Sequence, residues 1–462
     1  MADLHLVVDR AAGGLAAQIA REVREAVRSG RLVPGARLPA TRDLARDLGL
    51  SRGVVVEAYE QLVAEGLLES RTGAGTRIAA GAGRGAAPGH PADEREGRPH
   101  YGHRPTSPDL GLFPRQAWLA AVRHVLATLP NDALDYGDPG GVPALCREVA
   151  AYLGRVRAAD ASPDDVVVVT GVAQGLSLVV QALVRDRGRG IVLAVEDPTS
   201  ERQIPLLRRA GAHTVPVPVD REGIVVEALP GDADAVLVTP AHQYPTGVVL
   251  SPARRAALIG WAARTGALVL EDDYDAEVRF DRDPVGCLQG LAPDRVVLAG
   301  SVSKALAPGL RLGWIAAPPR VARAVRLARG ELDLGSPVID QYALAHLIAG
   351  GAYDRHLRRM RREYRRRRDA LVRALAEHLP WITVHGISAG LHLYAQLDGG
   401  ADGGGDLSGL AEAARAAGLS AEVVTPAHGP PGLVIGFARL PAHRVTDAVR
   451  ALAGNVSRDV RG

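Results

Sequence analysis

Apolar residues follow a helical period near the start of the chain and form short strand-like runs in its later part. Leu15, Ile19, Val23 and Val27 recur every four residues, which predicts a helix that stops near Gly30. Later in the chain, short apolar runs alternate with helical stretches; the runs span residues 166–169, 190–195, 235–239, 267–270 and 296–299. This alternation predicts an α/β domain with a largely parallel sheet, in which ligands bind at the carboxyl ends of the strands.

The first eighty residues have the pattern of a helix-turn-helix followed by a hairpin. A short helix over 42–48 and a longer one from 52 to about 65 are expected, with Thr41 and Ser51 as their caps and Gly49 in the turn. A hairpin is expected over residues 67–78. A small module that packs against another protein would have a similar pattern. The residues placed to touch DNA are Arg42, Ser51, Arg52, Arg71, Gly73 and Thr76.

The composition changes between these two parts of the chain. Residues 80–105 are rich in Gly, Ala, Pro and Arg without an apolar period, which predicts a flexible linker; a coupling element that reports ligand state is the alternative. The expected domains are therefore 1–79 and 106–455, with a smaller α/β subdomain from about residue 350. Within that subdomain, the arginine-rich run 358–368 is expected to be a solvated helix face, the alternative being a contact with the DNA backbone.

Bulk composition narrows the class of protein. The chain has 462 residues, 47% of them hydrophobic and 23% charged, which predicts a soluble protein of two or three domains. A net charge of +3 gives no argument for nucleic acid by itself, and two distant cysteines, Cys146 and Cys287, fit a reducing cytoplasm. No signal peptide is evident at the start, and the apolar stretch 166–184 is interrupted by polar residues, so we expect a buried strand that enters a helix and no contact with a membrane.

Lys304 is the only lysine in a chain that otherwise uses arginine for its permanent positive charges. A lysine amine, unlike an arginine guanidinium, can lose its proton and form an imine with an aldehyde. Ser301 and Ser303 flank it, and Arg311 follows seven residues later, which together suit a phosphate anchor. An aldehyde that carries a phosphate is pyridoxal 5′-phosphate (PLP), so we predict that cofactor here. The alternative is a lysine left by chance on a surface loop.

Two other strand ends carry polar chemistry. The run 267–270 is followed by the acidic segment Glu271 to Asp275; acidic residues in this position bind a metal, cap a helix or pair with a cation. Because Lys304 ends a following strand, we favour a carboxylate that pairs with the pyridinium nitrogen, and no metal site is predicted. The small-residue turn after 166–169 can offer backbone amides to a phosphate, although many strand-to-helix turns look alike.

The first part of the chain closely resembles the winged-helix domain of the GntR family. The resemblance extends over the whole module and rests on these elements: Gln18-Ile19, Pro34-Gly35, Leu38-Pro39, Leu48-Gly49, Ser51-Arg52, Ala58-Tyr59, Glu65-Gly66 and Gly75-Thr76. Residues 106–455 resemble a fold-type I aminotransferase, and the combination is similar to the MocR subfamily of transcription regulators. The matching elements are Tyr136-Gly137-Asp138-Pro139, Thr170-Gly171-Val172-Ala173-Gln174, Glu196-Asp197-Pro198, His242-Gln243-Tyr244-Pro245, Glu271-Asp272-Asp273-Tyr274-Asp275 and Ser301 through Arg311.

This resemblance implies a set of cofactor contacts. Lys304 would form the Schiff base with PLP, Asp272 would pair with the ring nitrogen, and Tyr274 would bond the ring hydroxyl. His242 or Gln243 would supply a second polar group near that hydroxyl, and the choice between them stays open. The phosphate would be held by the amides of Val172 and Ala173 and by Ser301, Ser303 and Arg311, joined by Tyr136 of a partner subunit in a homodimer.

Two positions depart from the family pattern. Ser200 stands where members of the subfamily often carry a tyrosine that stacks on the ring. Aminotransferases place the arginine that grips the substrate α-carboxylate near Val434, which here is apolar. Arg202 and Arg439 remain for a ligand carboxylate. These departures argue against ordinary transamination of amino acids.

We therefore predict a cytoplasmic, homodimeric, PLP-dependent transcription regulator that does not complete enzymatic turnover. Its head would bind a double-stranded DNA operator, and its body would sense an amine, an amino acid or PLP itself through the bond at Lys304. The alternative is an active aminotransferase with an appended DNA-binding head, which the pairing of Lys304 with Asp272 keeps open.

Overall fold

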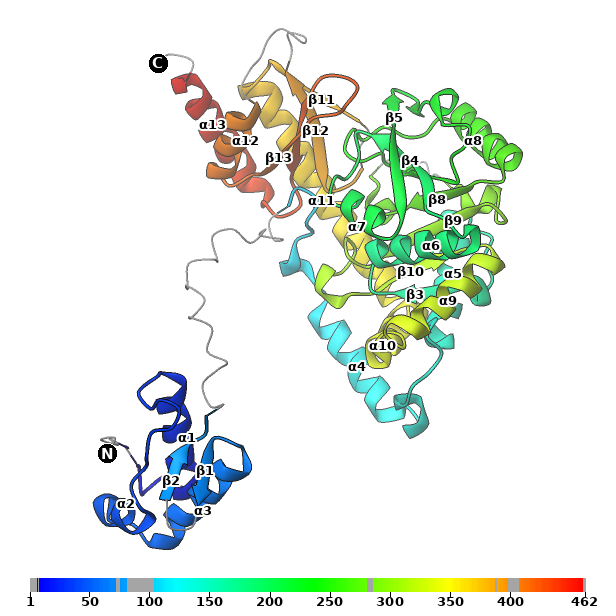
Figure 1. The fold of residues 1–462 in the computed structure, drawn as a ribbon. Coiled ribbons are helices and arrows are strands. Elements are labelled where there is room, and N and C mark those ends of the chain that lie inside the picture. The colour runs from blue at the N-terminus through cyan, green and yellow to red at the C-terminus, as the bar shows by residue number, and fades with distance from the viewer. Residues whose placement is uncertain are drawn as a thin grey trace. The chain divides into compact units, whose positions relative to one another are not determined.

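The computed structural model describes residues 6, 8–71, 75–80, 104–280, 286–386, 389–397 and 407–459. The chain forms two compact units, residues 1–100 and 101–462, which are described separately below (Figure 1). Most of the expected linker (81–103) and the hairpin residue Gly73 lie outside the described residues. In the part of the chain that is described, no helix is both long and apolar enough to cross a membrane.

The first unit is a three-helix module with a two-stranded wing. The apolar stripe predicted for the first helix is confirmed, since Ile19 and Val23 are fully buried against Val55 and Leu62 of the third helix. The wing strands are antiparallel, with Leu68 opposite Ile78. The elements are α1 (Leu15–Arg28), α2 (Thr41–Leu48), α3 (Arg52–Ala64), β1 (Leu68–Arg71) and β2 (Gly75–Ile78).

The helix ends differ in part from the prediction. Thr41 is the first residue of α2 and not its cap, because the cap position is taken by Ala40. Ser51 does occupy the cap position of α3, but its hydroxyl accepts no capping hydrogen bond. Gly49 ends α2 in the left-handed region (φ 61°), where glycine is favoured, and so makes the turn between the two helices.

The second unit is built on an eight-stranded sheet with the order β3-β10-β9-β8-β7-β4-β5-β6. Strands β9, β8, β7, β4 and β5 are parallel, while β10 runs antiparallel between β3 and β9, and β6 is antiparallel to β5. The predicted α/β fold with a mostly parallel sheet is confirmed. The strands are β3 (Val166–Val169), β4 (Ile191–Asp197), β5 (Ala212–Asp220), β6 (Gly223–Ile224), β7 (Ala235–Val238), β8 (Leu268–Asp272), β9 (Val296–Ser301) and β10 (Gly313–Ala316).

Both faces of this sheet are covered, which explains the continuous apolar runs of its strands. Val166 and Val168 of β3 pack in one core cluster, and Val167 and Val169 in another on the opposite face. The helices of this unit, apart from those of its C-terminal part, are α4 (Arg115–Thr128), α5 (Pro143–Arg157), α6 (Val172–Arg187), α7 (Ile204–Arg209), α8 (Pro252–Thr265), α9 (Pro319–Leu332) and α10 (Val338–Ala349).

Three strands continue past their apolar runs into polar residues. β8 includes Asp272, which lies opposite Ala299 in the ladder, and β9 includes Ser301, which lies opposite Gly313. β4 extends similarly to Asp197. The hydrophobic pattern marked only the apolar part of each strand, because ladder hydrogen bonds do not depend on the side chain. The polar residues at the carboxyl edge of the sheet are therefore held on rigid backbone.

The C-terminal part adds a four-stranded antiparallel sheet with the order β11-β12-β14-β13. A long helix buries Met360, Tyr364 and Leu371 in the same core cluster as this sheet. The elements are α11 (Ala352–His378), β11 (Ile382–His385), β12 (His392–Leu397), α12 (Leu407–Ala416), β13 (Ser420–Val424), β14 (Gly432–Gly436) and α13 (Ala442–Asp459).

The arginine run 358–368 lies on α11 and is mostly exposed, as predicted, with one clear exception. Arg367 is 5% exposed and forms ion pairs with Asp109 (2.9 Å) and Glu363 (2.8 Å). It also donates to the backbone carbonyl of Ala438. The preceding Arg366 faces water, with a side chain that is 68% exposed, and burial of Arg367 follows from the period of the helix.

Replacing the buried arginine is expected to destabilise the second unit. Arg367→Ala removes the buried partner of the half-buried Asp109 carboxylate and should lower the free energy of unfolding by about 3 kcal/mol. The neighbouring Arg366→Ala, whose side chain is 68% exposed, should cost less than about 1 kcal/mol. Urea unfolding of both variants checks this, and equal effects would contradict the structural role given to Arg367.

Candidate cofactor and ligand site

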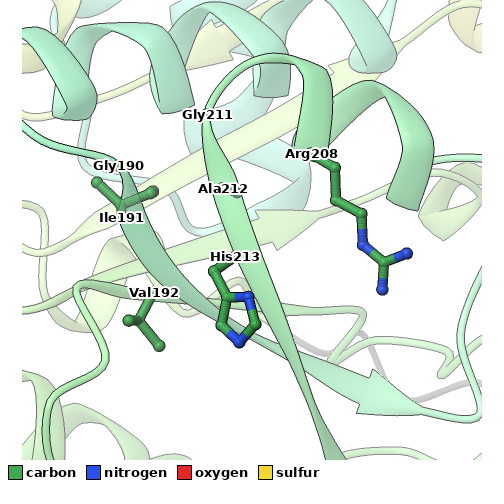
Figure 2. Close-up of a pocket in the computed structure, with 7 residues that line it drawn as sticks. All are labelled: Gly190, Ile191, Val192, Arg208, Gly211, Ala212 and His213. Carbon is green, nitrogen blue, oxygen red and sulfur yellow. The ribbon is translucent and has the colours of Figure 1, made fainter.

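The polar residues predicted for the cofactor meet at the carboxyl edge of the large sheet. β8 and β9 are parallel neighbours, so their carboxyl ends lie at the same edge. Asp272 is the last residue of β8, and Lys304 follows the end of β9 by three residues. The opposite edge holds the 490 Å³ hollow shown in Figure 2, which lies where β4 and β5 begin and is lined by Ile191, Arg208 and His213 among others. The two sites are separate.

Lys304 is half-buried, and its amine is held by a neighbour from far away in the sequence. Its Nζ atom donates to Oγ1 of Thr106 at 3.3 Å. Burial lowers the pKa of Lys304 to about 8, with a further lowering by the charge of Arg104, while Asp275 and Asp272 act in the opposite direction. A lowered pKa increases the fraction of neutral amine near pH 7, and the neutral amine is the nucleophile.

Asp272 has one carboxylate oxygen committed and one unpartnered. Oδ2 accepts a hydrogen bond from Nε2 of Gln203 at 2.9 Å. Oδ1 is buried and has no hydrogen-bond partner among the described residues. Burial is also the main cause that raises the pKa of Asp272 to about 6. An unpartnered buried acceptor is costly, and the N–H of a pyridinium ring would satisfy it. The residues present therefore fit a pyridoxal ring.

The acidic segment Glu271–Asp275, which begins in β8, divides its carboxylates among separate partners. Glu271 accepts from the backbone amides of Leu288 (2.8 Å) and Gln289 (3.1 Å). Asp273 forms a buried ion pair with Arg157 at 2.8 Å. Oε1 of Glu271 and Oδ1 of Asp272 are buried without a hydrogen-bond partner among the described residues, and of these two residues Asp272 is the one that ends β8. Among the described residues, no group of His, Cys, Asp and Glu side chains is arranged to hold a metal ion.

A hydrogen-bonded chain leads from Tyr274 into the protein. The Tyr274 hydroxyl lies 3.0 Å from Nδ1 of His242, which in turn lies 2.8 Å from Oδ2 of Asp275. His242 and Asp275 are both buried, and burial raises the pKa of Tyr274 well above its usual value. The ring of His392 lies 5.3 Å from that of His242, and burial lowers the pKa of His392 to about 3, so this second imidazole is neutral.

Gln243 has a different environment from His242. Its amide nitrogen donates to the carbonyls of Pro198 (2.8 Å) and Tyr244 (2.7 Å), and its Oε1 accepts from Thr246. All these bonds hold the loop that carries both residues. His242 is thus the one of the two whose side chain is linked to Tyr274.

The predicted phosphate-binding residues lie around the start of α6. Val172 and Ala173 are its first two residues, and their amides belong to the first turn, where N–H groups have no partner within the helix. A Cβ on Gly171 would lie 3.2 Å from Nη2 of Arg311, so the guanidinium lies beside this helix end. Ser301 is buried, and its hydroxyl accepts from the backbone amide of Ser303 at 3.3 Å. Tyr136 is 85% exposed.

The region where aminotransferases hold the substrate carboxylate is apolar at its centre. Val434 is 0% exposed and lies on β14 between Tyr394 of β12 and Glu422 of β13. Arg202 is paired with Glu422 at 3.1 Å, which offsets its charge. Arg439 is exposed just beyond β14. The structure thus does not place a buried arginine at this position.

In the first unit, the predicted DNA-contacting residues lie on exposed parts of the helix-turn-helix and wing. Arg42 is exposed on α2, and Ser51 and Arg52 are exposed at the start of α3. Thr76 on β2 is half-buried, with its hydroxyl 3.5 Å from that of Ser70. The backbone of Arg71 ends β1.

Sequence reasoning missed four residues of this site. Gln203, Asp275, His392 and Thr106 contact, or lie close to, the predicted cofactor residues. Asp275 stood in the recognised acidic run, and Gln203 follows Arg202 directly. Thr106 and His392 had no such signal, because they reach the site only through the tertiary fold.

Comparison with known proteins defines the class. The family described as aminotransferase class I and II matches residues 108–424, and the family of bacterial regulatory proteins named gntR matches residues 15–78. The computed structure is similar to a multiple substrate aminotransferase from Thermococcus profundus, with a TM-score of 0.69 and 24% identity over 77% of this chain and 91% of that one. The chain is a GntR-type DNA-binding head joined to a fold-type I aminotransferase domain, for which the cofactor is PLP.

Its relatives specify the subfamily. The chain is 31% identical to a probable rhizopine catabolism regulatory protein, MocR, of Rhizobium meliloti, over 97% of this chain and 95% of the relative. It is 38% identical to the pyridoxine biosynthesis transcriptional regulator PdxR of Corynebacterium glutamicum, over 81% and 82% of the two chains. The protein belongs to the MocR subfamily of GntR-family transcription regulators.

The lowered pKa of Lys304 predicts how the protein takes up its cofactor. Covalent capture of PLP requires the neutral amine, so its rate should rise with pH and level off above a midpoint near pH 8. An ordinary lysine would give a midpoint near about 10.4. The initial rate of the visible absorbance that appears when cofactor-free protein is mixed with PLP measures this, with N-acetyl-lysine as the control. A midpoint close to that of N-acetyl-lysine would contradict the effect of burial on the pKa of Lys304.

Proposed function

We propose that this regulator binds operator DNA through its head and responds to an amine or amino acid that reaches the cofactor held by Lys304. The observation that carries the proposal is Asp272, whose buried Oδ1 has no hydrogen-bond partner among the described residues at the same sheet edge as Lys304. Such a carboxylate suits a pyridinium ring. Because the chain also carries a DNA-binding head, the bound ring can serve regulation without enzymatic turnover.

Each predicted contact has a definite task in this proposal. When bound, PLP supplies an aldehyde carbon that exchanges amines and a ring that withdraws electrons. Lys304 binds the aldehyde, and Asp272 keeps the ring nitrogen protonated. Tyr274, oriented by His242, bonds the ring hydroxyl, and Gln243 only supports the loop.

The phosphate contacts are proposed from the arrangement at the start of α6. The amides of Val172 and Ala173 point out of the first turn, and Arg311 lies beside Gly171. Ser301 and Ser303 complete the set from the end of β9. Helix N-termini favour anions because unsatisfied N–H groups and the helix dipole both act there.

We propose that ordinary transamination is not the activity. Turnover requires that the substrate be gripped in a defined orientation, and a bidentate arginine usually does this. Val434 is buried and apolar at that position, and Arg202 is occupied by Glu422. The presence of Lys304 and Asp272 at the same edge of the sheet still favours a second candidate, an active aminotransferase. Product formed over many turnovers from a panel of amino donors and keto acids would support that candidate.

The protein is further proposed to act as a homodimer in the cytoplasm, where the DNA is. Tyr136 is 85% exposed within one chain, and a tyrosine in this element contributes to the partner's phosphate site in the aminotransferases it resembles. Two heads on one dimer would read two half-sites whose spacing depends on the arrangement of the body.

The response to an amine is tested by footprinting the DNA upstream of the protein's own gene with PLP, with and without candidate amines. The wild type should protect a site and change its protection when the effector is added. Lys304→Ala should fold, bind the same DNA and show no response, because the amine that bonds the cofactor is gone. A variant that retains covalent cofactor after borohydride treatment, or that still responds, would contradict the role of Lys304.

The DNA-binding role of the head predicts two different effects of arginine removal. Arg52→Ala, at the exposed start of α3, should weaken operator binding and reduce the slope of affinity against salt by about one if it contacts a phosphate. If it reads a base, the loss should be about 1–3 kcal/mol and restricted to the specific sequence. Fluorescence anisotropy at several salt concentrations measures both. Arg28→Ala, an exposed change at the end of α1, is the control.

A further inference from the structure

Residues 104–109 lie against Lys304 although they are distant from it in sequence. A turn is closed by two hydrogen bonds, from the Ser107 amide to the Arg104 carbonyl (2.9 Å) and from the Arg104 amide to the Ser107 hydroxyl (3.2 Å). Within this turn, Oγ1 of Thr106 accepts a hydrogen bond from Nζ of Lys304 at 3.3 Å. The segment thus contacts the atom that the proposed function assigns to the cofactor bond.

One helix holds the backbone on both sides of this contact. Nε2 of His356 on α11 donates to the carbonyl of Ala305, the residue after Lys304, at 2.8 Å. About two turns further along the same helix, the Tyr364 hydroxyl accepts from the backbone amide of Asp109 at 2.9 Å. The loop of Lys304 and the segment that carries Thr106 are therefore docked on the same rigid element.

Two further contacts fix the segment in place. Arg367, also on α11, pairs with the carboxylate of Asp109 at 2.9 Å. A Cβ on Gly436 of β14 would lie 2.5 Å from Cα of Pro105, so the backbones of the strand and the turn are in direct contact. Because the backbone is held on each side, the hydroxyl of Thr106 stays within reach of Nζ, and the chemistry of Nζ decides whether the hydrogen bond forms.

The hydrogen bond uses hydrogens that Nζ carries only as a free amine. When Nζ bonds the aldehyde carbon of PLP, its two amine hydrogens leave with the carbonyl oxygen as water. When an incoming amine replaces Lys304, a bond from the incoming nitrogen to that carbon forms, and the bond from Nζ breaks. The two hydrogens of the incoming nitrogen pass in net to Nζ, and nothing is oxidised or reduced. The released Nζ can then donate to Thr106.

We infer that Thr106 is a positioning residue that holds the Lys304 amine when an effector releases it from the cofactor. This rests on the proposed function, and it adds the group that stabilises the released form and so sets how easily an amine displaces Lys304. One such hydrogen bond changes an equilibrium constant by about fivefold. Without the acceptor, the released amine is less stable and the bond between Lys304 and the cofactor is favoured.

The test compares two ligands of the same site. PLP bonds Lys304, whereas 4′-deoxypyridoxine 5′-phosphate has a methyl group in place of the aldehyde and leaves Nζ a free amine. The full-length proteins, freed of cofactor, are the wild type, Thr106→Val and Thr106→Ala without the acceptor, and Thr106→Ser with it. The control is Thr265→Val, an exposed change at the end of α8. Isothermal titration calorimetry gives the dissociation constant of each ligand.

The preference for PLP over its deoxy analogue should rise about fivefold in Thr106→Val, because the free amine of this variant has no hydrogen bond to lose when it bonds the aldehyde. Thr106→Ala should shift the preference in the same direction. Thr106→Ser and Thr265→Val should keep the wild-type value. A merely structural role of Thr106 would change the affinity for both ligands in parallel and leave their ratio unchanged.

The pH dependence of PLP capture gives a second readout. A hydrogen bond accepted from Nζ favours the charged amine, so the midpoint of the capture rate against pH should fall in Thr106→Val and return in Thr106→Ser. The charged groups that act on Lys304 are Asp272 at the end of β8, Asp275 in the loop that follows and Arg104 in the turn, and all three are the same in every variant.

The outcomes separate this inference from the proposed function. An unchanged ratio or an unchanged midpoint in the variants without the acceptor overturns the role of Thr106, and the proposed function stands if borohydride fixes PLP to Lys304 of the wild type. A wild type in which borohydride fixes no PLP to Lys304 overturns both.

Discussion

The burial of two ionisable groups at one edge of one sheet is the constraint on which the site depends. Withdrawal from water lowers the pKa of Lys304 to about 8 and raises that of Asp272 to about 6. Near pH 7 each group is therefore within about one unit of losing its charge, or about 1.4 kcal/mol. A small change in either neighbourhood is enough to change a protonation state. That sensitivity suits an amine that must bond an aldehyde and release it again.

The large sheet maintains this burial because both of its faces are packed. Val167 and Val169 face one helical layer and Val166 and Val168 the other, so water reaches the sheet only at its edges. The carboxyl edge is then closed by polar loops, one of which is held by the hydrogen bonds of Gln243. Oδ1 of Asp272, by contrast with the Gln243 side chain, has no hydrogen-bond partner among the described residues. A buried acceptor without a protein partner is tolerated where a ligand supplies the donor.

Sequence reasoning recovered the parts of this arrangement that local chemistry encodes. The single lysine, the serines beside it and the acidic run at the end of β8 predict a cofactor without reference to the fold, and the alternation of apolar runs with helical stretches predicts a mostly parallel sheet. The burial of Arg367 within an arginine run, and the contact of Thr106 with Lys304, could not be predicted in this way. Both depend on which distant segment packs against a helix or a loop, and 198 residues separate the two partners of the second contact.

The contact between Thr106 and Lys304 also indicates how an aminotransferase body serves a regulator under the proposed function. An equilibrium between two arrangements shifts only as far as a ligand binds one of them better than the other. The Nζ of Lys304 is either engaged by the cofactor or free to carry a charge, and Thr106 lies beside it at 3.3 Å. The electrostatic environment of the segment that begins the body therefore differs between the two conditions. If the chemistry stops at amine exchange, the Lys304 amine stays released while the effector is bound, and the changed electrostatic environment persists. Rapid turnover would repeatedly restore the bond between Lys304 and the cofactor.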